Sequence, residues 1–204
     1  FQETGAFRTN RTTTFGMDTA DMPADGVVTG SAYVLGRPVH LASQDFTVMG
    51  GSAGEAHSIK VTETLKASLT TGTPFVFIND SGGARVQEGI DSLSGYGQVF
   101  YSNVKLSGAV PPISIIAGPC AGGAAYSPAL TDFIVMVQES AKMFIAGPDV
   151  IRAATGEVIS DEALGGARVH AEVSGNIHFS APDERAAIAT VKALLSYLPA
   201  NNLE

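Results

Sequence analysis

FVFINDSGGAR, residues 75–85, is the stretch that decides the fold. Its apolar run predicts a buried strand, and Gly82 and Gly83 predict a sharp turn from that strand into a helix. PISIIAGPCAGGAA, residues 112–125, repeats this order with a second glycine pair. Each turn leaves main-chain N–H groups at a helix start without an acceptor, and such groups carry partial positive charge. Two such turns that face one cleft can hold an oxyanion.

The rest of the chain continues the alternation of strands and helices. This alternation is typical of an α/β domain with a largely parallel sheet. Residues 1–204 are predicted to form a single domain, with a polar leader or loop at 1–25 and a linker at 199–204. The other predicted elements are a hairpin at 26–46, helices at 55–70 and 86–106, strands at 113–117, 132–137 and 142–145, a helix that starts at 148, and a last helix at 182–198.

Composition excludes several classes of function. With 204 residues, of which 45% are hydrophobic, the chain can bury a core of its own. Its net charge of -8 argues against partners such as nucleic acid or an anionic membrane surface. A single cysteine, Cys120, excludes an internal disulfide, and no apolar run is long enough to span a membrane. We therefore expect a bacterial cytoplasmic protein, with an organelle matrix as the alternative, and a chain that is part of a longer polypeptide.

Longer runs around both glycine pairs resemble the carboxyltransferase subunits of biotin-dependent acyl-CoA carboxylases. Together they cover nearly the whole chain, and motifs of this length are highly specific. Residues 11–40 resemble most closely the methylmalonyl-CoA carboxyltransferases, followed by the propionyl-CoA carboxylase β subunits. The runs are SQDFTVMGGSAGEAH (43–57), NDSGGARVQEGIDSLSGYGQVF (79–100), PISIIAGPCAGGAAYSPALTDF (112–133), FIAGPDVI (144–151) and LGGARVHAEVSGNIHF (164–179).

The resemblance implies a crotonase-like fold built from repeated ββα units. It also implies carboxyl transfer between carboxybiotin and the α-carbon of a short acyl-CoA, such as propionyl-CoA or methylmalonyl-CoA. Main-chain amides, rather than a metal or a side-chain base, would hold the thioester enolate. The amides of Gly122 and Gly123 would hold the thioester oxygen, and those of Gly83 and Ala84 would lie near the acyl carbon or the carboxylate. The expected substrate-binding residues are Ser81, Gly82, Arg85, Ala121 and Ala124.

The resemblance further implies partners, because this chain corresponds only to the first of two related halves in a family subunit. We expect it to pair with the C-terminal half, to form a homo-oligomer (a hexamer in the family), and to receive carboxybiotin on a biotin carboxyl carrier protein. The isolated chain should be inactive. The carboxyl donor stays open between another acyl-CoA and an ATP-driven carboxylase, and so does the acyl chain.

Other patterns allow different functions. GGSAG (50–54) fits the nucleophile-elbow motif of a serine hydrolase, with Ser52 as nucleophile and Asp132 with His170 or His178 as partners. Cys120 offers a thiol, although a small buried residue is the simpler interpretation. A non-catalytic oligomerisation module is the third class. The histidines lack metal-ligand spacing.

Overall fold

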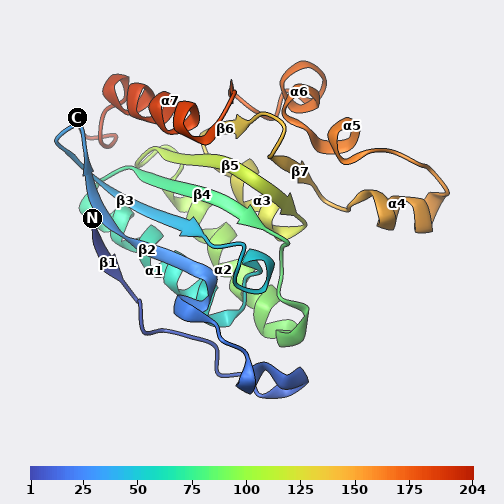
Figure 1. The fold of residues 1–204 in the computed structure, drawn as a ribbon. Helices are drawn as coiled ribbons and strands as arrows, with labels where there is room; N and C mark the ends of the chain where they lie inside the picture. Colours follow the sequence, from blue (N-terminus) through green and yellow to red (C-terminus); the bar gives the residue numbers. More distant parts are fainter.

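The computed structural model describes residues 1–204 and contains one eight-stranded sheet with helices on both faces (Figure 1). Helices α1 and α2 lie on one side of the sheet and α7 lies on the other. The strands are β1 (Gln2–Thr4), β2 (Val27–Val34), β3 (Arg37–Gln44), β4 (Phe75–Ser81), β5 (Pro112–Ala121), β6 (Phe133–Val137), β7 (Lys142–Phe144) and β8 (Phe179–Ala181). The helices are α1 (Glu55–Thr71), α2 (Ile90–Leu106), α3 (Gly123–Ala129), α4 (Pro148–Thr155), α5 (Asp161–Gly165), α6 (Ala167–Val169) and α7 (Glu184–Tyr197).

The order of the strands places the two glycine turns side by side. The sheet runs β1-β2-β3-β4-β5-β6-β8, with β7 paired to β5, and every pairing from β3 onward is parallel. Parallel neighbours end at the same edge of a sheet. Ser81 at the end of β4 is in register with Cys120 near the end of β5. The segments that follow these two strands therefore start next to each other.

Strand β4 shows how the sequence builds two cores. Successive side chains of a strand point to opposite faces. Phe75 and Phe77 belong to a buried cluster with residues of α1 and α2. Val76 and Ile78 pack against the larger cluster, which α7 completes from the other face. The apolar run at 75–78 is therefore buried on both sides, as expected for a strand in a parallel sheet.

The predicted α/β architecture is confirmed, with three local differences. The helix predicted at 86–106 begins only at Ile90, because Gly89 adopts φ 54° and separates it from a short 3-10 helix at Val86–Glu88. The leader contributes strand β1, which pairs with β2. The tail is bonded to the molecule, since the Asn202 N–H donates to the Ala109 carbonyl. No helix has both the length and the apolar character needed to cross a membrane.

Candidate functional site

The two glycine turns are in contact. Gly83 has φ 100°, and a Cβ built on it would lie 2.6 Å from the carbonyl oxygen of Ala121 and 3.9 Å from the amide nitrogen of Gly123. A side chain at Gly83 would therefore collide with the second turn. We call the segment 81–85 the first bend and the segment 120–124 the second bend. Their contact places the two bends next to each other, so one ligand could touch both.

Hydrogen bonds to Ala53 orient the first bend. The Ala53 N–H donates to the Gly83 carbonyl (2.9 Å), and the Arg85 N–H donates to the Ala53 carbonyl (3.0 Å). In a planar trans peptide the N–H points opposite to the C=O. The Ala84 N–H therefore points away from Ala53, and it has no acceptor in the structure.

The second bend offers donors at the start of α3. Gly123 and Ala124 are the first two residues of this helix, so their N–H groups have no acceptor within it, and no side chain caps them. Gly122 differs from our expectation, because its N–H donates to the carbonyls of Phe144 (3.1 Å) and Ile145 (3.2 Å). The available donors at this bend are those of Gly123 and Ala124.

Two other N–H groups at the first bend, those of Gly82 and Gly83, are already hydrogen-bonded within the protein. The Gly83 N–H donates to the Ser81 hydroxyl oxygen at 3.1 Å, and the Gly82 N–H donates to the Gly50 carbonyl at 2.9 Å. Ser81 itself is buried, so its hydroxyl holds the bend rather than a ligand. Ala84 is the one residue of the expected donor pair whose N–H remains free.

A ligand can reach both bends from solvent. Gly82 is exposed, and Ala84, Ala121 and Gly123 are half-buried. Behind Gly123 lies the ring of Tyr96 from α2, because a Cβ built on Gly123 would be 3.0 Å from three of its carbons. The Tyr96 side chain thus forms the floor of the second bend.

Arg85 is not a ligand-facing cation, contrary to expectation. Its guanidinium has no exposed surface and forms ion pairs with Asp25 (2.6 Å) and Glu88 (2.8 Å). No pattern in the sequence indicated this pairing, because Asp25 lies 60 residues before Arg85 in the segment 1–25, which was predicted to be a polar leader or loop. The guanidinium is enclosed on the inner side of the first bend and is committed to these partners.

Two titratable side chains lie at or next to the bends, and both have raised pKa values. Burial raises the pKa of Cys120, so the thiol stays neutral and inert. Burial also raises the pKa of Asp80, with further contributions from Glu184 and Asp45. No group of three or more histidines, cysteines and acids lies close enough to hold a metal ion. The chemistry that this arrangement supports is stabilisation of a developing negative charge by main-chain donors.

The structure does not support the serine hydrolase interpretation. The Ser52 hydroxyl donates to the Met49 carbonyl at 2.7 Å and bonds no histidine. His170 bonds Ser174 and the Met143 carbonyl, and His178 accepts from the Ile134 N–H. Because Ser52 shares no hydrogen bond with either histidine, the triad is not assembled.

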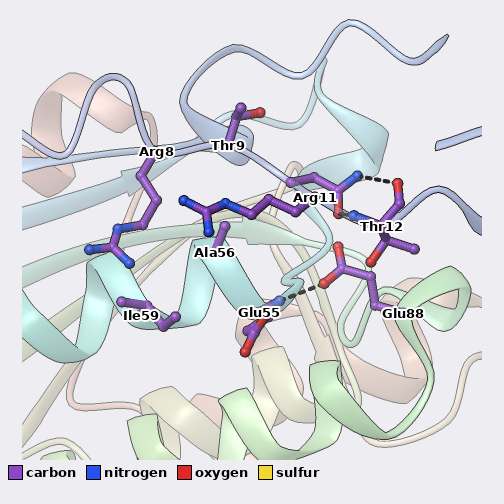
Figure 2. A pocket seen from close by; sticks show the side chains of 9 residues that line it. Arg8, Thr9, Arg11, Thr12, Glu55, Ala56, Ile59 and Glu88 are labelled. Carbon is purple, nitrogen blue, oxygen red and sulfur yellow. Dashed lines mark hydrogen bonds between the residues drawn. The ribbon is translucent and has the colours of Figure 1, made fainter. Parts of the chain in front are cut away.

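A large cavity lies elsewhere, between the leader and α1 (Figure 2). It has a volume of about 560 Å³, and none of the bend residues lines it. Arg8 and Arg11 of the leader extend over the first turns of α1, and Arg8 pairs with Glu63 at 3.1 Å. Glu88 reaches this cavity as well, and its carboxylate accepts the N–H of Glu55 at 2.7 Å. Sequence reasoning assigned the leader no chemistry and missed this cavity.

Residues 1–204 match the family described as carboxyl transferase domain. The chain is 67% identical over its full length to the methylmalonyl-CoA carboxyltransferase 12S subunit of Propionibacterium freudenreichii subsp. shermanii, covering 39% of that protein. It is 56% identical, again over its full length, to the propionyl-CoA carboxylase beta chain of Saccharopolyspora erythraea, covering 37% of it.

A solved structure agrees with these relatives. The crystal structure of transcarboxylase 12S, described as a hexamer with methylmalonyl-coenzyme A and methylmalonic acid bound, superposes with a TM-score of 0.98 at 66% identity. The chain covers 40% of that protein and all of its own length is matched. The crotonase-like fold is thereby confirmed. The chain spans about two fifths of the length of the relatives that it matches.

Proposed function

This chain belongs to the carboxyl transferase domain family, and on that premise we propose that it supplies the acyl-CoA half of a carboxyltransferase active site. The reaction moves a carboxyl group between carboxybiotin and the α-carbon of propionyl-CoA or methylmalonyl-CoA. The observation that carries this proposal is the contact between the two bends, which brings the free Ala84 N–H next to the start of α3.

The chain's main-chain donors would lower the barrier for forming the thioester enolate. When a carboxyl group is added, the α-carbon loses a proton and the negative charge accumulates on the thioester oxygen. Donors that already point at this position stabilise the charge without reorganising, and removing one such donor typically costs about 2.7 to 4 kcal/mol. The Gly123 N–H is assigned to the thioester oxygen. The Ala84 N–H is assigned to the acyl carbon side or to the transferred carboxylate.

Biotin, delivered on a carrier protein, would supply both the carboxyl group and the base. The residues of this chain fit that division of work, because the segments 81–85 and 120–124 contain no histidine, aspartate or glutamate to remove the proton. The chain therefore binds and orients the acyl-CoA, and its glycine bends keep bulky side chains away from the reacting carbon.

A second surface is needed to complete the site. Tyr126 and Ile145, which flank the second bend, are 46% and 65% exposed, although both are apolar enough to favour burial. We propose that the C-terminal half of the family subunit covers these two side chains, from the same or a neighbouring copy in a homo-oligomer. The bends offer no support for hydrolysis with Ser52 as nucleophile or for a purely structural role of this chain.

The test uses the full-length subunit that contains this chain. The subunit is mixed with a biotin carrier protein charged with ¹⁴C-carboxyl and with propionyl-CoA, and the label is followed into methylmalonyl-CoA. Transfer of the label by the unmodified subunit supports the proposal, whereas no transfer to propionyl-CoA or to any other short acyl-CoA refutes it.

A further inference from the structure

Arg85 uses every N–H of its guanidinium inside the protein. Nη1 donates to Asp25 Oδ1 (2.6 Å) and Glu88 Oε1 (2.8 Å). Nη2 donates to the carbonyls of Ser52 (2.7 Å) and Asp25 (3.5 Å), and Nε donates to the Ser52 hydroxyl (3.3 Å). All five donors of a fixed planar fork are therefore placed. Such a complete set restricts the side chain to one orientation.

These bonds hold the segment that orients Ala84. The Arg85 main chain donates to the Ala53 carbonyl, and the Arg85 side chain donates to the hydroxyl and the carbonyl of Ser52, the residue before Ala53. Ala53 in turn donates to the Gly83 carbonyl. The peptide between Gly83 and Ala84 is therefore fixed by a closed loop of bonds that starts and ends at Arg85.

The carboxylate partners anchor this loop to helix α1. Glu88 Oε2 accepts the N–H of Glu55, the first residue of α1, and Asp25 Oδ2 accepts the N–H of His57, two residues further along the helix. Asp25 lies in a run of three residues, 24–26, that all have positive φ (51°, 53° and 73°). Left-handed backbone at non-glycine residues is strained and persists only when its surroundings enforce it. The network therefore connects the first bend to a rigid helix and to a strained turn.

We propose that Arg85 is a positioning residue for carboxyl transfer, which acts by fixing the direction of the Ala84 N–H. This inference rests on the proposed function, since it needs Ala84 to face the acyl group. Arg85 itself touches no ligand, because its guanidinium is fully enclosed. Its contribution is to keep the peptide plane of Ala84 in the orientation that the reaction needs.

Arg85→Lys in the full-length subunit tests this proposal. Lysine keeps the charge but has three donors on a flexible stem instead of a planar fork, so it cannot bind Asp25, Glu88 and Ser52 together. The matched control is Arg152→Lys, whose native arginine pairs with Asp149 at the surface, 2.9 Å away. The measurements are kcat and KM for propionyl-CoA with charged carrier, together with urea unfolding of each variant.

We expect Arg85→Lys to lower kcat by about 10-fold to 100-fold, because a donor misplaced by about 1 Å costs up to about 100-fold in rate. KM for propionyl-CoA should stay within about twofold, because the lost interaction belongs to the transition state and not to ground-state binding. kcat is calculated per folded subunit from the urea unfolding curves, which separates this effect from a loss of folded protein. Arg152→Lys should match the parent. A folded Arg85→Lys subunit whose kcat lies within about twofold of the parent value overturns the inference.

Glu88→Gln keeps the inference open to refutation if Arg85→Lys does not fold. Glutamine preserves the shape of the side chain and an oxygen for the Glu55 N–H, but it removes the negative charge that pairs with the Arg85 guanidinium. We therefore expect kcat to fall while KM is unchanged. An unchanged kcat in this variant overturns the inference. If the parent subunit itself transfers no carboxyl group, the proposed function fails instead, and the two failures are thus distinguishable.

Discussion

Lowering the pH should destabilise the chain through His57. This side chain is 1% exposed, and burial lowers its pKa from 6.5 to about 3. Its neutral form fits a chain of hydrogen bonds. Gln44 Oε1 accepts the Asp80 N–H (3.0 Å), so the Gln44 amide nitrogen donates to His57 Nε2 (3.3 Å), and His57 Nδ1–H donates to the Asp25 carbonyl (3.0 Å). A proton on Nε2 would face a donor.

The size of the effect follows from the pKa difference. Below pH 6.5 the unfolded chain protonates this histidine, but the folded chain does so only near pH 3, so unfolding takes up a proton in between. The contribution of neutral His57 to the free energy of unfolding is therefore fully present above pH 6.5 and is lost as the pH falls from 6.5 toward about 3. At about pH 5, roughly 1.5 units below the unfolded pKa, the loss is about 2 kcal/mol, at about 1.36 kcal/mol per unit.

The assay is urea unfolding at about pH 7 and about pH 5, for the parent chain and for His57→Gln, which cannot titrate. The parent should lose about 2 kcal/mol more unfolding free energy than the variant between these conditions. Burial also raises the pKa of Asp25 and Asp80, but these carboxyls are present in both proteins and act alike in each. An identical pH dependence in parent and variant would refute the reasoning.

Three further predictions concern the bends and a helix start. Gly123→Val should lower carboxyl transfer by the full-length subunit at least about 100-fold, because its Cβ would lie 3.0 Å from the Tyr96 ring. The control Gly97→Val meets no atom within 4 Å and should keep the rate. Equal rates in both variants would exclude the second bend from the active site. Ala84→Pro removes the free N–H and should lower kcat by about 100-fold or more, whereas Ala84→Gly keeps the N–H and should stay close to the parent; a full rate in the proline variant would exclude this donor. Asp183→Ala deletes the cap on the Ala186 N–H of α7 (2.7 Å) and should lower the free energy of unfolding by about 1 kcal/mol; urea unfolding with no change would show that the cap is not needed.

Local sequence signals predicted the elements that carry the site. The helix expected at 55–70 is α1, which ends at Thr71, and the strand expected from the apolar run before Gly82 is β4, which ends at Ser81. These predictions succeed because periodicity and glycine placement are properties of neighbouring residues. The contact between the bends also followed, since parallel strands of successive βα units end at the same edge.

The hydrogen-bond partners of the bends were beyond the reach of the sequence. The Gly122 N–H is taken by carbonyls 22 and 23 residues further along the chain, at Phe144 and Ile145, which depends on how β7 pairs with β5. Arg85 and Asp25 are 60 residues apart and belong to no shared motif. Pairings of this kind are set by tertiary register, so an N–H that looks available in the sequence can be occupied in the fold.

The reliance of both bends on peptide nitrogens determines which genetic changes can reveal them. A conventional alanine scan leaves position 84 untouched, since the native residue is already alanine, and at glycine positions it reports crowding instead of lost chemistry. Replacing a single amide by an ester through protein semisynthesis deletes one N–H and adds no atoms to the side chain. Evolution meets the same restriction, because a protein whose reactive groups are common to all residues can change its catalytic strength only by moving its backbone.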